Sequence, residues 1–231
     1  MIAADKQKIA EFLDITGDFL GCGYKSDKKD YQFYDDHATD SQSGADSLDQ
    51  IAWEIKGCRN CPLCEKRHNA VPGEGAPQPI VMVIGEAPGE EEDKQGRPFV
   101  GKAGQLLDKM LDSICLSRSS NCFIANVVKC RPPGNHDPLP EETSACAHFL
   151  HRQITLLKPK FILFAGRIAA QTVLKTGEPL GKLRGRFHDL IIGDITIPAV
   201  ATYHPAALLR NDDYKRPAWE DLKLLRSRIE N

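Results

Sequence analysis

The feature that most constrains the fold is an alternation of short apolar runs with longer amphipathic segments, which begins near residue 80. The apolar runs predict strands at 80–85, 122–128, 160–165 and 197–202. The other segments predict helices at 102–115, 140–157, 166–175 and 217–229, and an added antiparallel strand within 185–196. This order is typical of a parallel sheet with helices on both faces. We therefore predict an α/β fold with three α/β/α layers around a central, mostly parallel sheet of four to five strands.

The first 46 residues lie outside this alternation. Residues 7–20 predict a short amphipathic helix, whereas 21–46 are polar and predict a mobile linker. A further helix is predicted at 47–57, with Ser47 as its N-cap. We therefore divide the chain into an N-terminal helix and linker at 1–46 and a folded domain at 47–231.

Composition limits the classes of protein to which the chain can belong. The 231 residues are 41% hydrophobic, which is enough for a sizeable core. No apolar run reaches the roughly 18 residues of a membrane span, and the first 14 residues lack the apolar core of a signal peptide. The formal charge of −2 still allows a basic face. We expect a cytoplasmic monomer that makes no contact with a membrane.

The chain has eight cysteines, and in a cytoplasmic protein these favour metal binding over disulfides. Cys58-x-x-Cys61-x-x-Cys64 precedes the alternating region, and Cys130 and Cys146 lie within it. Four thiolates suit tetrahedral zinc or an iron–sulfur cluster, and the spacing alone does not choose between them. Ordinary buried thiols are the alternative. Cys64 is either a ligand in place of Cys58 or a spare thiol, and we expect Cys115 and Cys122 in the core.

Two loops follow predicted strands and carry candidate site residues. Gly85-Glu86-Ala87-Pro88-Gly89 follows the first strand, and Tyr203-His204-Pro205 follows the last one. Ligands of open α/β sheets bind at the carboxyl ends of the parallel strands. We therefore expect both loops to contribute to one pocket.

Several long motifs occur in one order over roughly 51–230. They are Cys58-x-x-Cys61, Gly73-Glu74-Gly75, Gly85–Gly89, Gly96–Gly104, Asn126–Pro133 and His204–Arg210. This set resembles the family-4 uracil-DNA glycosylases, the iron–sulfur branch of the uracil glycosylase superfamily. The resemblance implies a monofunctional enzyme that hydrolyses the N-glycosidic bond of deoxyuridine in DNA and leaves an abasic site. It also implies a structural [4Fe–4S] cluster held by Cys58, Cys61, Cys130 and Cys146, with Cys64 outside the ligand set.

The resemblance also implies how the pocket holds a uracil flipped out of DNA. The amide of Asn126 both donates and accepts, which matches the O4 and N3–H of uracil and mismatches cytosine. Phe99 stacks on the base, and backbone N–H groups around Glu86 and Ala87 face its O2. His204 stabilises the departing uracil anion by charge or by a hydrogen bond. Without the resemblance, the alternative interpretation is that Asn126 and His204 are ordinary residues at strand ends and that Phe99 is a core residue.

The motifs leave open which group activates water. The best-known members of the superfamily carry an aspartate at the position of Ala87, so here a carboxylate must come from elsewhere or be dispensable. We assign Glu86 to positioning, Glu92 to water or cation stabilisation, and Asn135 to holding the water. Glu90, Glu91 and Asp93 are expected on a solvated face or as loop caps.

Contacts with DNA are expected after His204. Leu208 and Leu209 resemble the wedge that fills the gap left by the flipped nucleotide, with helix packing as the alternative, and Arg210 is assigned to a phosphate. Further phosphate candidates are Lys102, Lys129, Arg131 and Arg184. The expected partner is uracil-containing DNA, single- or double-stranded.

Two other functions remain open. The first is an iron–sulfur protein that binds uracil-DNA tightly or covalently through His136, with little turnover. His136 stands where family 4 usually has arginine, and a related branch traps the sugar with a loop histidine, although the basic motif around that histidine is absent here. The second is a zinc-bound nucleic-acid protein with a decayed pocket.

Overall fold

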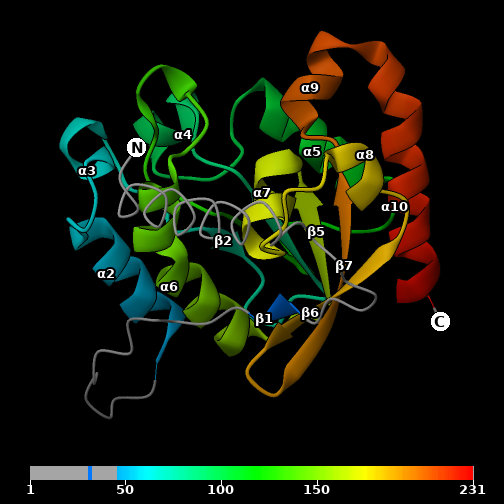
Figure 1. Ribbon diagram of the computed structural model, residues 1–231, viewed down its shortest axis with the longest axis horizontal. Helices are drawn as coiled ribbons and strands as arrows, with labels where there is room; N and C mark the ends of the chain where they lie inside the picture. The colour runs from blue at the N-terminus through cyan, green and yellow to red at the C-terminus, as the bar shows by residue number, and fades with distance from the viewer. Residues whose placement is uncertain (1–30, 33–45, 231) are drawn as a thin grey trace, which may run out of the picture. The chain divides into compact units, whose positions relative to one another are not determined.

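The computed structural model describes residues 31–32 and 46–230, and these carry one sheet with helices on both of its faces (Figure 1). Among the described residues, seven strands pair in the order β1-β6-β7-β5-β3-β4-β2. The strands are β1 (Tyr31–Gln32), β2 (Glu74–Gly75), β3 (Val81–Gly85), β4 (Cys122–Asn126), β5 (Phe161–Ala165), β6 (Phe187–Ile192) and β7 (Ile195–Thr202).

Helices and short turns connect the strands. The helices are α2 (Leu48–Gly57), α3 (Leu63–Lys66), α4 (Glu90–Gln95), α5 (Lys102–Asp112), α6 (Pro140–Leu157), α7 (Arg167–Val173), α8 (Leu180–Leu183), α9 (Pro205–Arg210) and α10 (Lys215–Ile229). The 3₁₀ turns are η1 (Pro133–Asn135) and η2 (Asp212–Tyr214). No helix in this described part of the chain is long and apolar enough to cross a membrane.

The centre of the sheet is parallel, as the sequence predicts. Strands β4, β3, β5 and β7 run in one direction, whereas β2 and β6 are antiparallel to their neighbours. Gly85 pairs with Asn126, so β3 and β4 end at the same level. All five predicted strands are present, and the two-residue strands β1 and β2 extend the sheet. The carboxyl ends of the parallel strands therefore form one edge that can carry a site.

Strand β1 lies in the segment that the sequence predicts to be a linker. It pairs with β6 through Tyr31 and Leu190. The predicted helix at 7–20 and the rest of the predicted linker up to residue 45 lie outside the described residues. The division of the chain at residue 46 therefore stays a prediction.

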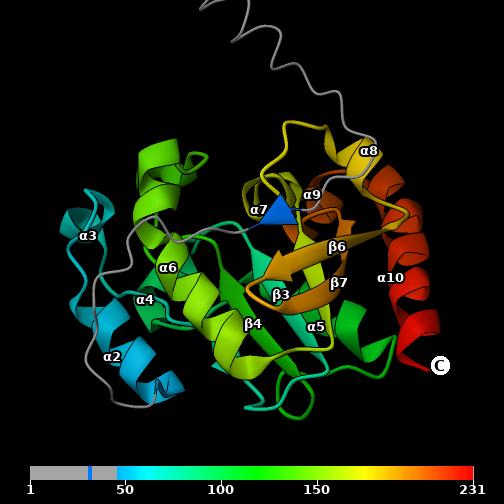
Figure 2. The ribbon, with the colours of Figure 1, turned by 60° about the horizontal axis from the view of Figure 1, so that its bottom comes forward.

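The two faces of the sheet bury separate apolar clusters. On β3, Met82 and Ile84 join a cluster with α2, α6, α7 and α8, whereas Val81 and Val83 join one with α5, α9 and α10. Figure 2 shows α2 and α6 on one side of the strands and α5 and α10 on the other. Burial on both faces explains why β3 is a continuous apolar run. The predicted three-layer architecture is confirmed.

Polar contacts hold α2 against α6. Ser47 caps α2 through its hydroxyl, which accepts from the Gln50 amide at 3.1 Å, as predicted. Arg152 of α6 donates to both oxygens of Asp46, at 2.9 and 2.6 Å, and to Glu54. These contacts bring the carboxyl end of α2, where Cys58 lies, into a fixed relation to α6, which carries Cys146.

Helix α4 was not predicted, because its residues are almost all charged and show no apolar periodicity. It starts after Gly89, whose amide donates to the Glu92 carboxylate at 3.1 Å. It ends at Gly96, which adopts φ 69°. Capping and a left-handed glycine therefore define this helix where a hydrophobic stripe does not.

Helix α6 offers a matched test of the core. Ile154 is 1% exposed between α6 and the sheet, whereas Leu156, two residues on, is 37% exposed. We expect Ile154→Ala to lower the free energy of unfolding by about 2–5 kcal/mol, because it leaves a cavity. Leu156→Ala should change it by about 0.5 kcal/mol or less. Urea denaturation followed by circular dichroism measures both, and equal losses would contradict this packing.

Candidate active site

One pocket lies at the carboxyl ends of β3, β4 and β7. Eight residues assigned from the sequence line it: Glu86, Ala87, Glu92, Phe99, Asn126, Asn135, His204 and Arg210. The lining is completed by Pro88, Gly89, Ala103, Pro132, His136, Asp137 and Ala206. The parallel topology thus brings together residues that are up to 124 positions apart in the chain, from Glu86 to Arg210.

Asn126 is the last residue of β4 and is 1% exposed. Its side-chain oxygen Oδ1 is buried and has no hydrogen-bond partner among the described residues. Its backbone carbonyl accepts from Nζ of Lys129 at 2.8 Å. An unpaired buried acceptor destabilises a folded protein, so it is rare unless a ligand or water fills the gap. The Asn126 amide is therefore arranged to receive a hydrogen-bond donor in the pocket.

Gly85 lets the Asn126 amide approach the ring of Phe99. A Cβ at Gly85 would lie 2.4 Å from Oδ1 of Asn126 and 2.7 Å from Cζ of Phe99. The Phe99 ring is itself 5.5 Å from the His204 ring, centroid to centroid, with 31° between the planes. An amide, an aromatic ring and an imidazole therefore meet in one small volume. This volume suits a flat polar ring that can stack and form hydrogen bonds.

Glu92 binds backbone amides with both carboxylate oxygens. Oε1 accepts from the amides of Val100 and Gly101, at 2.8 and 2.9 Å, and Oε2 accepts from that of Gly89. These bonds tie α4 to the loop that carries Phe99. Both carboxylate oxygens of Glu92 are thus bonded to backbone amides, and its predicted contact with water or a cation stays a prediction.

Glu86 is the carboxylate in the pocket whose proton affinity is most changed. Burial, together with the negative charge of Asp137, raises the pKa of Glu86 to about 7, while the positive charge of Arg167 opposes the shift. Arg167 also donates to Asp137 at 2.6 Å. Glu86 is therefore poised to exchange a proton near neutral pH.

His204 forms the N-cap of α9, and its Nδ1 accepts from the Ala206 amide at 3.1 Å. Burial lowers the pKa of His204 to about 4, and the charge of Arg210 acts in the same direction. The imidazole is thus neutral at physiological pH. Because Nδ1 is an acceptor, the proton of the neutral ring lies on Nε2, which is then a hydrogen-bond donor.

The loop after Cys130 closes another side of the pocket. Nε of Arg131 donates to Oδ1 of Asn135 at 2.8 Å, and Asn135 itself has a positive φ of 55°. Nδ1 of His136 lies 2.8 Å from the carbonyl of Asp137. The Asp137–Arg167 ion pair joins this loop to α7. The loop is therefore shaped by its own polar contacts next to Glu86.

Three residues predicted to contact DNA are buried or already paired. Leu208 is 2% exposed and packs in the cluster with α5 and α10, whereas Leu209 is 51% exposed. Lys129 is 1% exposed, and Arg184 donates to Asp221 at 3.0 Å and to the carbonyl of Pro217. Burial contradicts the predicted DNA contacts of Leu208 and Lys129, whereas the phosphate contact of Arg184, whose side chain is 20% exposed, stays a prediction.

Asp93 also differs from its predicted setting. It was expected on a solvated face or as a loop cap, and only the second is right, since it is 1% exposed. Its carboxylate accepts from the amides of His68 and Asn69, at 2.9 and 3.3 Å. Asp93 therefore anchors the segment that follows α3 to α4.

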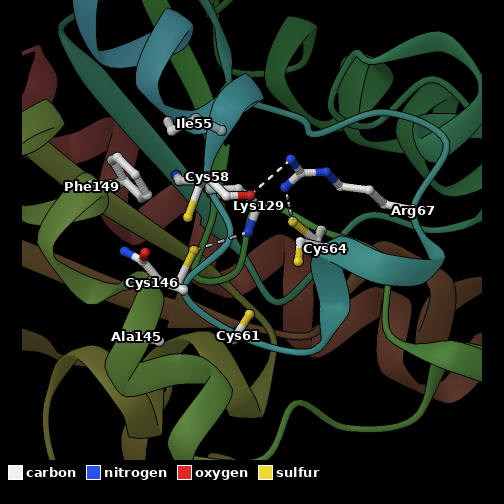
Figure 3. Close-up of a pocket in the computed structure, with 11 residues that line it drawn as sticks. Ile55, Cys58, Cys61, Cys64, Arg67, Lys129, Ala145, Cys146 and Phe149 are labelled. Carbon is white, nitrogen blue, oxygen red and sulfur yellow. Dashed lines mark hydrogen bonds between the residues drawn. The ribbon is translucent and has the colours of Figure 1, made fainter.

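Five cysteines line a second cavity, which lies between the end of α2, α3 and α6 (Figure 3). They are Cys58, Cys61, Cys64, Cys130 and Cys146. In Figure 3 the labelled cysteines surround a common space, with the side chains of Arg67 and Lys129 beside them. The prediction that Cys122 is a core residue is confirmed, whereas Cys115 is exposed.

Two N–H groups beside this cavity donate hydrogen bonds to cysteine sulfurs. Nη1 of Arg67 donates to Sγ of Cys130 at 2.9 Å, and the Lys129 amide donates to Sγ of Cys146 at 3.3 Å. The other end of the Arg67 guanidinium donates to the carbonyl of Cys58 at 3.0 Å. Thiols with N–H donors and cations beside them suit an anionic, thiolate-bound cluster. In the described part of the chain no group of three or more His, Cys, Asp or Glu side chains is placed so that it could hold a metal ion.

Arg67 was not found by sequence reasoning. Its only signal was a basic residue three positions after Cys64, and basic residues are common on surfaces. The contact with sulfur becomes visible only when the segment 58–67 is folded against Cys130.

Comparisons with known proteins agree with the pocket. The model of the Uracil DNA glycosylase superfamily matches residues 72–223. A type-4 uracil-DNA glycosylase of Sulfurisphaera tokodaii is 45% identical over 78% of this chain and 84% of its own length. One of Thermotoga maritima is 41% identical over 79% of this chain and 94% of its own length. A type-5 uracil-DNA glycosylase of Pyrobaculum aerophilum is 32% identical over 55% of the chain and 62% of its own length.

The type-4 relatives match along most of their length, and the superfamily match includes Asn126, Phe99 and His204. Motif order, fold and pocket geometry lead to the same assignment. The chain belongs to the type-4 uracil-DNA glycosylases of the uracil-DNA glycosylase superfamily.

Proposed function

We propose that this protein is a monofunctional uracil-DNA glycosylase, which hydrolyses the N-glycosidic bond of deoxyuridine in DNA and leaves an abasic site. The observation that carries the proposal is the buried, unpaired Oδ1 of Asn126, which lies beside the Phe99 ring in the pocket. Family membership supports the same activity.

The pocket offers uracil a complementary edge. Oδ1 of Asn126 accepts from N3–H of the flipped base, and Nδ2 donates to O4. Cytosine presents an acceptor at N3 and a donor at N4, so both contacts would be reversed. Phe99 stacks on the base and contributes roughly 1–3 kcal/mol. Ala87, being small, leaves room for the ring at the loop after β3.

Bond cleavage leaves a pair of electrons on uracil. As the C1′–N1 bond breaks, negative charge spreads to O2 of the base, where Nε2–H of His204 donates a hydrogen bond. Because burial keeps His204 neutral, it stabilises the anion by this bond and without a positive charge. The sugar gains oxocarbenium character at the same time.

Glu86 supports the attack of water on C1′. Its carboxylate orients the water and takes up a proton as the new C1′–O bond forms. Asn135, held by Arg131, is the second contact for this water. Glu92 assists indirectly, through the backbone of the Phe99 loop.

The exposed residues around the pocket suit a DNA partner. Leu209 is the side chain that enters the gap left by the flipped nucleotide, and Arg210 at the pocket rim binds a phosphate. We also propose a monomer that acts in the cytoplasm. The seven described cysteines form no disulfide with one another, which fits a reducing compartment.

For the cysteine cavity we propose a [4Fe–4S] cluster held by Cys58, Cys61, Cys130 and Cys146. The N–H donors of Arg67 and Lys129 support it, since they face two of these sulfurs. The cluster would link α2, the strand end after β4 and α6, and would take no part in the reaction. Cys64, in α3, lies outside this ligand set.

A cleavage assay tests the activity. The purified protein is incubated with a labelled oligonucleotide that contains one uracil, and then treated with alkali. We expect alkali-dependent cleavage at uracil, no cleavage of the matched cytosine strand, and a loss of about 100-fold or more in Asn126→Ala, because a preorganised polar contact is removed. A stable protein–DNA adduct that disappears in His136→Ala would instead favour the covalent binder.

The raised pKa of Glu86 predicts the pH dependence. Below about pH 7 the folded protein holds Glu86 protonated, so kcat/KM should rise with pH up to about 7 and then level off. Glu86→Gln should remove this rise together with most of the activity. Glu91→Gln, on the exposed face of α4, is the control and should keep the wild-type profile. A wild-type profile that is flat between pH 5 and 9 would count against Glu86 as the base.

Serine substitutions test the cluster. Cys58→Ser and Cys146→Ser should lower the iron and sulfide bound by anaerobically purified protein, because each removes a thiolate ligand. Cys64→Ser should keep both at the wild-type level. Wild-type protein that contains zinc and no iron would rule out the cluster, and without cleavage activity it would favour the zinc-bound alternative.

A further inference from the structure

Arg118 lies in the turn between α5 and β4, outside the pocket lining, and its guanidinium uses all three of its nitrogens. Nε donates to Asp108 of α5 at 2.9 Å, and Nη1 donates to Glu74 of β2 at 2.8 Å. Nη1 also donates to the carbonyl of Pro98, and Nη2 to that of Phe99, both at 2.9 Å. One side chain therefore joins a helix, an edge strand and the backbone of the Phe99 loop.

The Phe99 backbone needs such support. Its φ is 52°, in the left-handed region that a bulky side chain rarely adopts. Conformations of this kind persist only where the surroundings hold them. The amides that follow Phe99 are bound by Glu92, and the carbonyls at and before Phe99 are bound by Arg118. The loop is thus held from two sides.

The first turn of α5 packs tightly against the same carbonyl. A Cβ at Gly104 would lie 1.9 Å from the Phe99 oxygen, so this position accepts no side chain. The Phe99 carbonyl therefore has no room to turn towards α5. In this position the Phe99 carbonyl accepts a hydrogen bond from Nη2 of Arg118. The planar fork of arginine can bind two adjacent carbonyls and two carboxylates together, which a lysine ammonium cannot match.

We propose that Arg118 is a positioning residue for uracil recognition, because it fixes the backbone that aims the Phe99 ring at the flipped base. The two carboxylates orient the guanidinium, and the guanidinium holds the loop. The inference rests on the proposed function, since the base that Phe99 meets is uracil.

Arg97 provides a matched control. It donates to the same carboxylate, Glu74, at 2.7 and 3.0 Å, but its side chain is 57% exposed and it donates no hydrogen bond to the Phe99 carbonyl. Arg97→Met and Arg118→Met each remove one positive charge, and each removes one arginine that donates to Glu74. Only Arg118→Met removes the donors to the loop.

The first measurement is a double-mutant cycle in the uracil-cleavage assay, with Arg118→Met, Phe99→Ala and the double variant. We expect Arg118→Met to raise KM about tenfold with little change in kcat, in the range that weakening one base–aromatic stack produces. In the Phe99→Ala background the same substitution should have almost no further effect, since residues that act through one another are not additive. Arg97→Met should leave both constants unchanged. Additive losses would overturn the proposal.

The second measurement is amide hydrogen exchange over residues 97–101, which does not depend on the reaction. We expect faster exchange there in Arg118→Met and wild-type exchange in Arg97→Met. Unchanged exchange in Arg118→Met would overturn the proposal, even if activity falls. If the wild-type protein does not cleave uracil-DNA, the proposed function fails while the exchange still tests the clamp. Should Arg118→Met not fold, Arg118→Lys takes its place, with the same expected exchange.

Discussion

The approach of the Asn126 amide to the Phe99 ring across Gly85 is the contact on which the site depends. It exists because β3 and β4 are parallel neighbours that end at the same level, so that Gly85 pairs with Asn126. At this point any side chain on Gly85 would collide with both groups. Two further side chains stabilise this arrangement, because Glu92 and Arg118 form hydrogen bonds with the backbone of the loop that carries the Phe99 ring. The proposed recognition of the base therefore depends first on backbone geometry, which places the Asn126 and Phe99 side chains.

Lys129 lines the cysteine cavity and connects it to Asn126 of the pocket. Its amide donates to Sγ of Cys146, and its Nζ donates to the carbonyl of Asn126 and to Oε1 of Gln153. Both acceptors of Nζ are neutral, and burial lowers the pKa of this lysine to about 8. A buried ammonium is costly without nearby negative charge. In the proposed cluster, the cysteine sulfurs next to Lys129 would carry such charge.

The pKa values of two titratable groups in the pocket, Glu86 and His204, are shifted in opposite directions by the same cause. Burial disfavours the charged form, so it raises the pKa of Glu86 to about 7 and lowers that of His204 to about 4. One group can therefore take up a proton at neutral pH, while the other donates a hydrogen bond as a neutral ring. Environments that separate two pKa values in this way are typical of sites that perform acid–base chemistry. The Ala206 amide completes the arrangement, because it sets the tautomer of His204.

The sequence by itself determined the parallel sheet and the residues that meet at its edge. Apolar runs buried on both faces identify the central strands, and parallel strands place their carboxyl ends together, so Asn126, Glu86 and His204 converge without further information. Only the tertiary structure decided which side chains face inward. Leu208 is buried and Leu209 exposed, Lys129 supports Asn126 from the core, and Glu92 binds backbone amides where a water contact was expected. The physical reason is that a repeating pattern fixes where the backbone goes, whereas the partner of a polar atom depends on segments far away in the chain, as with Arg118 and Phe99.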